Sequence, residues 1–186
     1  MIRNIVQKED KVLRQNAKEI PVHEIASPKI QKILKEMSIS LKSQDDGVAI
    51  AAPQIGYALR IFVVSGKIFE ENFVKEREER LSGKKTINSV TKTQKESKDL
   101  VFINPKISKL SHEKEWVPEG CLSVRWLYGK THRSKKATIT AYDKNGKKFT
   151  RGASGLLAQI FQHETDHLNG ILFIDHAKDI IEEIPK

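Results

Sequence analysis

Residues 155–170 read GLLAQIFQHETDHLNG, and this stretch decides how the rest of the chain must fold around it. Apolar residues recur through it at helical spacing, and His163 and His167 continue the same stripe. On an α-helix, residues four positions apart point within about 40° of each other, so the two imidazoles lie on one face. The pattern predicts a buried helix with both histidines on its core-facing side. The apolar positions of the stripe and its flank are Leu156, Leu157, Ile160, Phe161 and Leu168.

The two histidines and the intervening Glu164 form an HExxH pattern, in which two imidazoles share one metal ion and a carboxylate lies beside it. Residues 119–123 read EGCLS and contain the only cysteine of the chain, Cys121. A thiolate and two neutral imidazoles leave a fourth position open, as in a catalytic rather than a structural metal site. These ligands suit Zn²⁺, Fe²⁺ or Co²⁺. The alternative is a chance HExxH in a charged helix, with Cys121 as a small buried hydrophobe.

Three segments then resemble, in order and spacing, the signature segments of the peptide deformylase family: residues 47–54 (GVAIAAPQ), 119–123 (EGCLS) and 162–168 (QHETDHL). The resemblance covers roughly residues 2–64 and 101–175. It implies a metal-dependent hydrolase that removes the N-terminal formyl group from newly made polypeptides beginning with formyl-methionine and releases formate. It also implies one divalent metal ion, with Fe²⁺ as the native ion and Zn²⁺ or Co²⁺ as alternatives.

The resemblance also assigns roles to individual residues. It implies three metal ligands, which are Cys121, His163 and His167. Glu164 would carry a proton from water to the leaving nitrogen, while the Gln54 side-chain amide and the Leu122 backbone N–H would donate to the oxyanion. Gln54 could instead only cap a turn, and the apolar residues could be ordinary core. The residues implied to contact the substrate are Val48, Ala49, Gly120, Leu156 and Ile160.

The chain departs from the family pattern beside these segments. Ala49 stands where the family usually has a second glycine, and Arg125 and Trp126 follow Val124 where a proline and small or polar residues are common. Tyr128 replaces an arginine often found near the pocket. These departures bear on pocket shape and substrate preference.

The charged residues near the predicted ligands can be interpreted in two ways. Glu119, Arg133 and Asp166 either orient the ligand segments as a second layer around the metal or are solvated charges. Histidines outside the ligand pattern are expected at the surface, and they are His23, His112, His132 and His176.

Composition indicates an intracellular enzyme. The 186 residues suffice for one well-buried domain, and a single cysteine cannot form an internal disulfide. No apolar run approaches a membrane span or the core of a secretory signal. The net charge of +9 fits an anionic neighbour such as the ribosome surface, but the basic residues are interleaved with acids, which argues against a specific DNA site. Formylated substrates imply a bacterial cytoplasm or an organelle of bacterial descent, and the Lys- and Glu-rich residues after position 66 favour the organelle.

The wider pattern predicts an α+β fold, with antiparallel or mixed β-sheets packed around a central metal-binding helix. Residues 1–186 are expected to form one domain. Ser27 should cap a helix that starts at Pro28, while Ser154 should cap the histidine helix and Gly170 end it in a left-handed conformation. The turn at Asp143–Gly146 carries a hairpin signal. The expected strands are Leu59–Val64, Leu100–Ile103, Ala137–Tyr142 and Ile171–Ile174.

The segment at about 66–100 has a different composition. Between Gly66 and Asp99 it holds nine Lys or Arg and seven acids, with few residues that could fill a core. The favoured interpretation is a tolerated charged surface insertion between two strands, because long loops cost little closure entropy. A docking segment for a partner is the alternative. Within the segment, Asn72–Leu81 could form a solvated helix.

Two other functions remain open on these residues. An HExxH zinc metallopeptidase usually takes its third ligand from a downstream histidine or glutamate, and here the upstream EGCLS segment argues against it. A non-catalytic, basic ribosome-binding module with a structural metal would need a closed four-ligand site and would be indifferent to Glu164.

Overall fold

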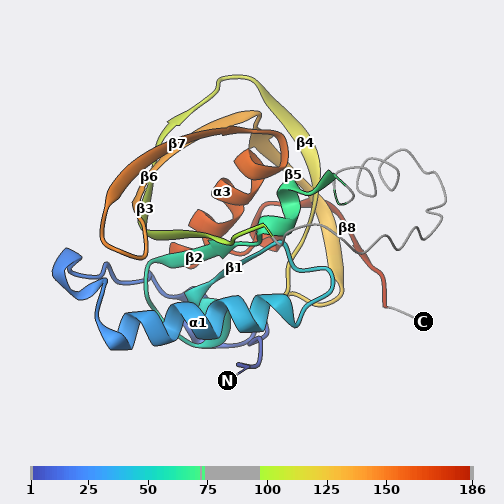
Figure 1. The fold of residues 1–186 in the computed structure, drawn as a ribbon. Coiled ribbons are helices and arrows are strands. Elements are labelled where there is room, and N and C mark those ends of the chain that lie inside the picture. The colour runs from blue at the N-terminus through green and yellow to red at the C-terminus, as the bar shows by residue number, and fades with distance from the viewer. Residues whose placement is uncertain (1, 72, 74–96, 185–186) are drawn as a thin grey trace.

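A computed structural model describes residues 2–71, 73 and 97–184 of the chain. Two sheets enclose the helix α3, Gly155–Leu168, and every pairing between their named strands is antiparallel (Figure 1). The predicted α+β class is confirmed, with antiparallel rather than mixed sheets. The five-stranded sheet runs in the order β1 (Ala49–Ala51), β2 (Ile61–Val64), β3 (Leu100–Leu110), β6 (Lys136–Tyr142) and β7 (Lys148–Ser154). The three-stranded sheet has the order β4 (Lys114–Gly120), β5 (Leu127–Ser134) and β8 (Lys178–Glu182).

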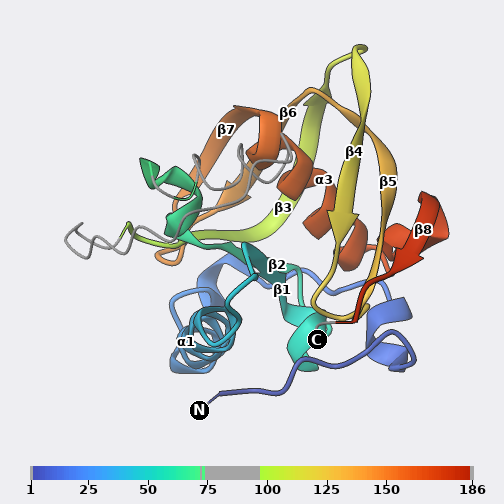
Figure 2. The ribbon, with the colours of Figure 1, turned by 90° about the vertical axis from the view of Figure 1, so that its right-hand side faces the viewer.

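The five-stranded sheet is covered on both faces where β1 and β2 lie. α3 packs on one face and α1, Pro28–Lys42, lies on the other (Figure 2). Successive residues of β2 alternate between the two cores: Phe62 belongs to the cluster around α3, and Val63 to the cluster around α1. The Phe62 ring stacks on Phe102 of β3 with centroids 4.6 Å apart. Phe161 of α3 lies against both rings, with centroids 6.3 and 5.2 Å away, and so packs the helix onto the sheet.

Helix α1 begins as predicted. Pro28 is its first residue, and the Ser27 hydroxyl accepts a hydrogen bond from the Ile30 backbone N–H at 3.4 Å. Its buried apolar residues are Ile30, Ile33, Leu34, Met37 and Leu41. In the described part of the chain, neither this helix nor α3 has the length and apolarity of a bilayer span.

Helix α3 ends as predicted but begins differently. Gly170 follows the helix with φ of +73°, and a Cβ there would lie 2.8 Å from the Arg14 backbone, so a side chain would be strained and crowded. Ser154 occupies the N-cap position, but its side chain makes no capping hydrogen bond. The predicted capping role of Ser154 is therefore wrong.

The structure confirms three of the predicted strands, with different bounds. Leu59 lies outside β2 and forms an isolated bridge with Lys18, while β3 continues seven residues beyond Ile103. The Ala137–Tyr142 strand and its turn are confirmed, since β6 and β7 form a hairpin in which the Gly146 N–H bonds the Asp143 carbonyl at 3.0 Å.

Ile171–Ile174 is not a strand. The chain turns there into a 3-10 helix, Phe173–Asp175, in which the Leu172 backbone N–H donates to the Asp175 carboxylate at 2.9 Å. Leu172 and Phe173 are apolar because they are buried in a small cluster with Leu13 and Val124. An apolar run of four residues does not distinguish a strand from a buried turn.

The charged segment joins β2 to β3, which are neighbours in the sheet. Its first turn is a 3-10 helix, Gly66–Phe69, in which Ile68 is 7% exposed and belongs to the core cluster around α3. Phe73 packs against the same cluster. Ile68 and Phe73 are thus among the few residues of this segment that contribute to the core. Apart from Phe73, the predicted helix of Asn72–Leu81 lies outside the described residues.

Candidate metal centre and pocket

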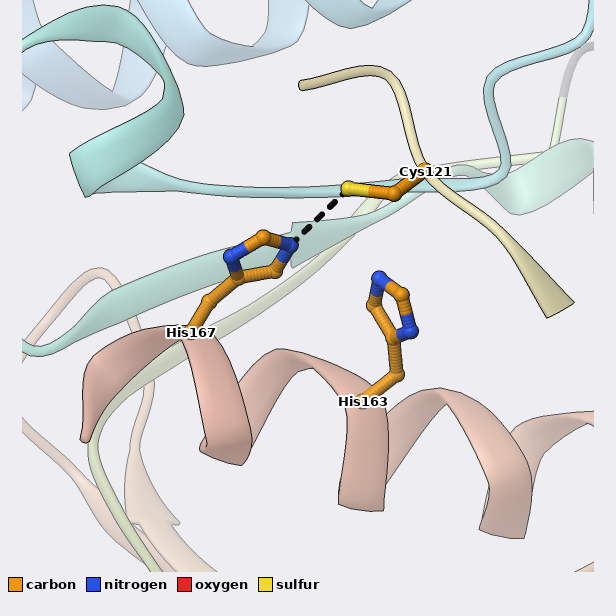
Figure 3. A group of neighbouring side chains, drawn as sticks. All are labelled: Cys121, His163 and His167. Carbon is orange, nitrogen blue, oxygen red and sulfur yellow. Dashed lines mark hydrogen bonds between the residues drawn. The ribbon is translucent and has the colours of Figure 1, made fainter. Parts of the chain in front are cut away.

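The three predicted ligands meet at the centre of the molecule. His163 and His167 project from successive turns of α3, and Cys121 follows the end of β4 (Figure 3). The His167 Nε2 atom lies 3.1 Å from the Cys121 Sγ atom, and the imidazole centroids are 5.0 Å apart. One ligand atom from each of the three residues lies within 4.8 Å of the others. A thiol and two imidazoles at this spacing fit a divalent ion of the Zn²⁺ or Fe²⁺ type.

Glu119 holds one of these ligands in place. Its Oε2 atom lies 3.1 Å from the Nδ1 atom of His163, which leaves the Nε2 atom of that ring for the cluster. Glu119 is 5% exposed and lies two residues before Cys121 on the same segment. One carboxylate thus couples β4, which leads into Cys121, to α3, which carries both histidines.

Arg133 completes this buried network from the neighbouring strand β5. Its Nε and Nη2 atoms donate to the two Glu119 oxygens at 2.8 and 3.0 Å, and its Nη1 atom donates to Asp166 at 2.7 Å. Burial raises the pKa of the Glu119 carboxyl, but the hydrogen bonds with His163 and Arg133 outweigh it and hold the pKa well below its ordinary range. Glu119 is therefore a charged acceptor, and of the two interpretations of these residues the buried network is the one that the structure contains.

Two glutamines of α3 anchor the helix to the second sheet. The Gln162 side chain accepts from the Ser134 N–H and donates to the Ser134 carbonyl, both at 3.0 Å. Gln159 donates to the Pro118 carbonyl at 2.8 Å. Neither contact was predicted from the sequence, although a polar residue beside a buried helical stripe indicates a side chain that needs a partner.

Glu164 is buried beside the ligands. It is 3% exposed, and its Oε2 atom has no hydrogen-bond partner among the described residues. Burial raises the pKa of Glu164 to about 7. The Nδ1 atom of His167 is likewise buried without a partner in the described part of the chain.

Gln54 has a fixed orientation at the same place. Its Oε1 atom accepts a hydrogen bond from the Ala51 N–H at 2.8 Å, next to the 3-10 helix Ala52–Ile55. This contact directs the Nε2 atom towards the Ser123 hydroxyl at 3.2 Å and the Cys121 sulfur at 3.5 Å. The Gln54 oxygen therefore accepts a backbone hydrogen bond, while its amide nitrogen faces the predicted ligands.

These groups open onto a pocket of about 430 Å³. Of the predicted functional residues only His167 is absent from its lining, and that residue is 1% exposed. Gly120 lies beneath Tyr128, where a Cβ would come within 2.7 Å of the tyrosine ring. The predicted residues in the lining are Val48, Ala49, Gln54, Gly120, Cys121, Leu122, Leu156, Ile160, His163 and Glu164. Other lining residues include Asp46, Phe73, Arg125, Trp126 and Gln159.

A thiol and two imidazoles that converge beside a pocket lined by a buried carboxyl are the side chains of a metal-dependent hydrolase. The polypeptide deformylase family model matches residues 2–182. This chain belongs to that family, whose enzymes remove N-formyl groups from nascent peptides, and the resemblance seen in the three sequence segments is confirmed.

Relatives and solved structures agree with this membership. Peptide deformylase 2 of Clostridium acetobutylicum is 35% identical over 181 residues, covering 97% of this chain and 99% of that protein. The chloroplastic peptide deformylase 1A of Solanum lycopersicum is 36% identical over 172 residues, covering 92% of this chain and 58% of that protein. The structure of a Synechococcus elongatus peptide deformylase in complex with actinonin matches with a TM-score of 0.75 and 29% identity, covering 95% of this chain and 81% of that one. The relatives thus include both bacterial and organellar enzymes.

Proposed function

We propose that this chain hydrolyses the formyl group of N-formylmethionyl peptides with one divalent ion held by Cys121, His163 and His167. The observation that carries the proposal is the convergence of the three ligand atoms within 4.8 Å, with Glu164 in the same pocket. The contact between Glu119 and the Nδ1 atom of His163 supports it, because ligating histidines commonly donate their other ring nitrogen to a carboxylate. Fe²⁺ is the proposed native ion, with Zn²⁺ or Co²⁺ able to replace it.

Cys121, His163 and His167 would hold the divalent ion, which would supply Lewis acidity to the attacking water and the formyl carbonyl. Glu164 accepts the proton that the attacking water loses and returns it to the departing amine nitrogen as the carbon–nitrogen bond breaks. The Gln54 Nε2 atom and the Leu122 backbone N–H donate to the oxygen that gains negative charge. The products are formate and a peptide with a free N-terminus.

The substrate is proposed to lie along β1. Among the described strands it is at the edge of the five-stranded sheet and pairs only with β2, while Val48 and Ala49 line the pocket. An extended peptide can therefore add to the edge through main-chain hydrogen bonds. Gly120, Leu156 and Ile160 would surround the methionine side chain. Apolar walls suit an apolar first residue.

The proposed partners are nascent formyl-methionyl chains, and the net charge of +9 supports an encounter near the anionic ribosome surface. For location we propose an organelle of bacterial descent, with a bacterial cytoplasm as the alternative. The Lys- and Glu-rich segment supports the organelle, and the relatives include both kinds of source.

The test is the Glu164→Ala variant, assayed for metal content, melting temperature and formate release from formyl-Met-Ala-Ser on one sample. The variant should keep the metal and the fold while turnover falls by at least about 10²-fold, the low end of a general acid–base contribution. A variant that retains more than about a tenth of parental activity would remove Glu164 from the proton path. Cleavage of internal peptide bonds by the parent would instead favour the metallopeptidase alternative.

A further inference from the structure

One ion pair joins the two walls of the pocket. The Arg125 Nη1 atom lies 2.6 Å from the Asp46 Oδ2 atom, and the Nη2 atom lies 3.1 Å from both Asp46 Oδ1 and Gln44 Oε1. Asp46 precedes β1 and Arg125 follows Cys121, so the contact connects segments 79 residues apart in sequence. Both side chains line the pocket that holds Cys121 and Glu164.

Arg125 makes further contacts, with Trp126 and Gln7. Its guanidinium lies over the Trp126 ring, 4.5 Å from the centroid. Its backbone N–H donates to the Gln7 side chain at 3.3 Å, and Gln7 in turn donates to the Leu122 carbonyl at 3.1 Å. The segment after the cysteine therefore contacts the N-terminal segment at Gln7 as well as Asp46.

The ion pair between Arg125 and Asp46 lies at the mouth of the pocket. The Arg125 side chain is 20% exposed and the Asp46 side chain 50%, whereas Glu164 at the floor is 3% exposed. A pair as exposed as this contributes little to folding stability, so stability alone does not account for it. Its two-point geometry instead fixes the distance and orientation of the groups it joins.

We propose that Arg125 and Asp46 form a positioning pair that sets the width of the pocket mouth for the peptide residues following formyl-methionine. The inference rests on the proposed deformylase function. Gly47, Val48 and Ala49 run from Asp46 into the edge strand β1, and Cys121 lies four residues before Arg125. A peptide lying along β1 passes between these two walls, so the pair governs how its second and third residues are held. A substrate without those residues does not sense the pair.

The experiment compares two substrates of different length, formyl-Met-Ala-Ser and formyl-methionine amide. Arg125→Ala and Asp46→Asn should each raise KM for the longer substrate by about three- to tenfold with little change in kcat. Values for the short substrate should stay within about twofold of the parent. The double variant Arg125→Ala/Asp46→Asn should be no worse than either single variant, because the two residues act as one unit.

Arg14→Ala is the matched control. Arg14 makes a similar two-point contact with the Asp175 carboxylate, at 2.5 and 3.1 Å, away from the pocket lining. It should leave the ratio of the two substrates unchanged. Equal losses on both substrates in the Arg125 and Asp46 variants, or no loss on either, would overturn the positioning role. If the parental protein releases no formate from either substrate, the proposed function itself is rejected.

Discussion

At the floor of the pocket the polar side chains are enclosed, whereas at its mouth they are partly open to solvent. Glu119 and Glu164 line the pocket and are 5% and 3% exposed, and Arg133, which contacts Glu119, is 8% exposed. The Arg125 and Asp46 side chains at the mouth are 20% and 50% exposed. Buried charged contacts are costly to break, while partly exposed ones are adjustable. The floor is therefore expected to tolerate almost no change, and the mouth to tune which peptides are accepted.

The strongest test of this contrast removes the thiol at the floor. Cys121→Ala should lose metal and activity together, because two imidazoles alone hold an ion much less well than a three-ligand set. Metal analysis and formate release on the same sample check this. His23→Ala is a suitable control, since that histidine side chain is 83% exposed and lies outside the cluster. Full metal content with unchanged turnover in Cys121→Ala would remove the cysteine from the ligand set.

A smaller effect is expected one layer out. Arg133→Met leaves the buried Glu119 carboxylate and the partly exposed Asp166 carboxylate without their shared partner, which should lower the free energy of unfolding by about 3 kcal/mol. Metal affinity should fall by about 10- to 100-fold, because Glu119 would orient His163 less well. Chemical denaturation and competition with a chelator measure the two effects. Lys135→Met, which breaks an exposed pair with Glu113, should change stability by about 1 kcal/mol or less. Similar values for the two variants would contradict the contrast between buried and exposed contacts.

Most residues at the floor of the pocket could be predicted from the sequence, because their relative positions depend on local spacing along the chain. Spacing along one helix fixes the relation of His163 to His167, and the EGCLS segment supplies Cys121 with Glu119 two residues away. Resemblance to a known family then indicated Gln54, whose role no local pattern reveals. The strand predicted at Ile171–Ile174 was wrong because an apolar run indicates burial but does not determine backbone conformation.

The second sheet could not be predicted from periodicity. Its strands β4 and β5 point Glu119 and Arg133 inwards, so the expected alternation of apolar and polar residues is absent. A proline disfavours a central strand, but Pro118 lies in β4, which is at the edge of its sheet, where proline is tolerated. The contact between Arg125 and Asp46 was equally hidden, because only the folded chain brings together residues 79 positions apart.

The smallest expected effect concerns Phe73, which lines the mouth from the charged segment between β2 and β3. Because this ring also packs against the core cluster around α3, Phe73→Ala should open one pocket wall and raise KM for formyl-Met-Ala-Ser by about threefold with kcat nearly unchanged. Phe69→Ala is the matched control, since that ring is 47% exposed and is not part of the pocket lining.

A second variant separates this residue from the rest of the charged segment. A Gly-Ser linker that replaces residues 74–96 but keeps Ile68 and Phe73 should leave deformylation within about threefold of the parent, because loop length costs little closure entropy. Steady-state kinetics on both variants and the control decide between the interpretations. If the linker variant loses much more activity than Phe73→Ala while its melting temperature is unchanged, the charged residues themselves act on the substrate. The surface-insertion hypothesis would then have to be abandoned for that part of the chain.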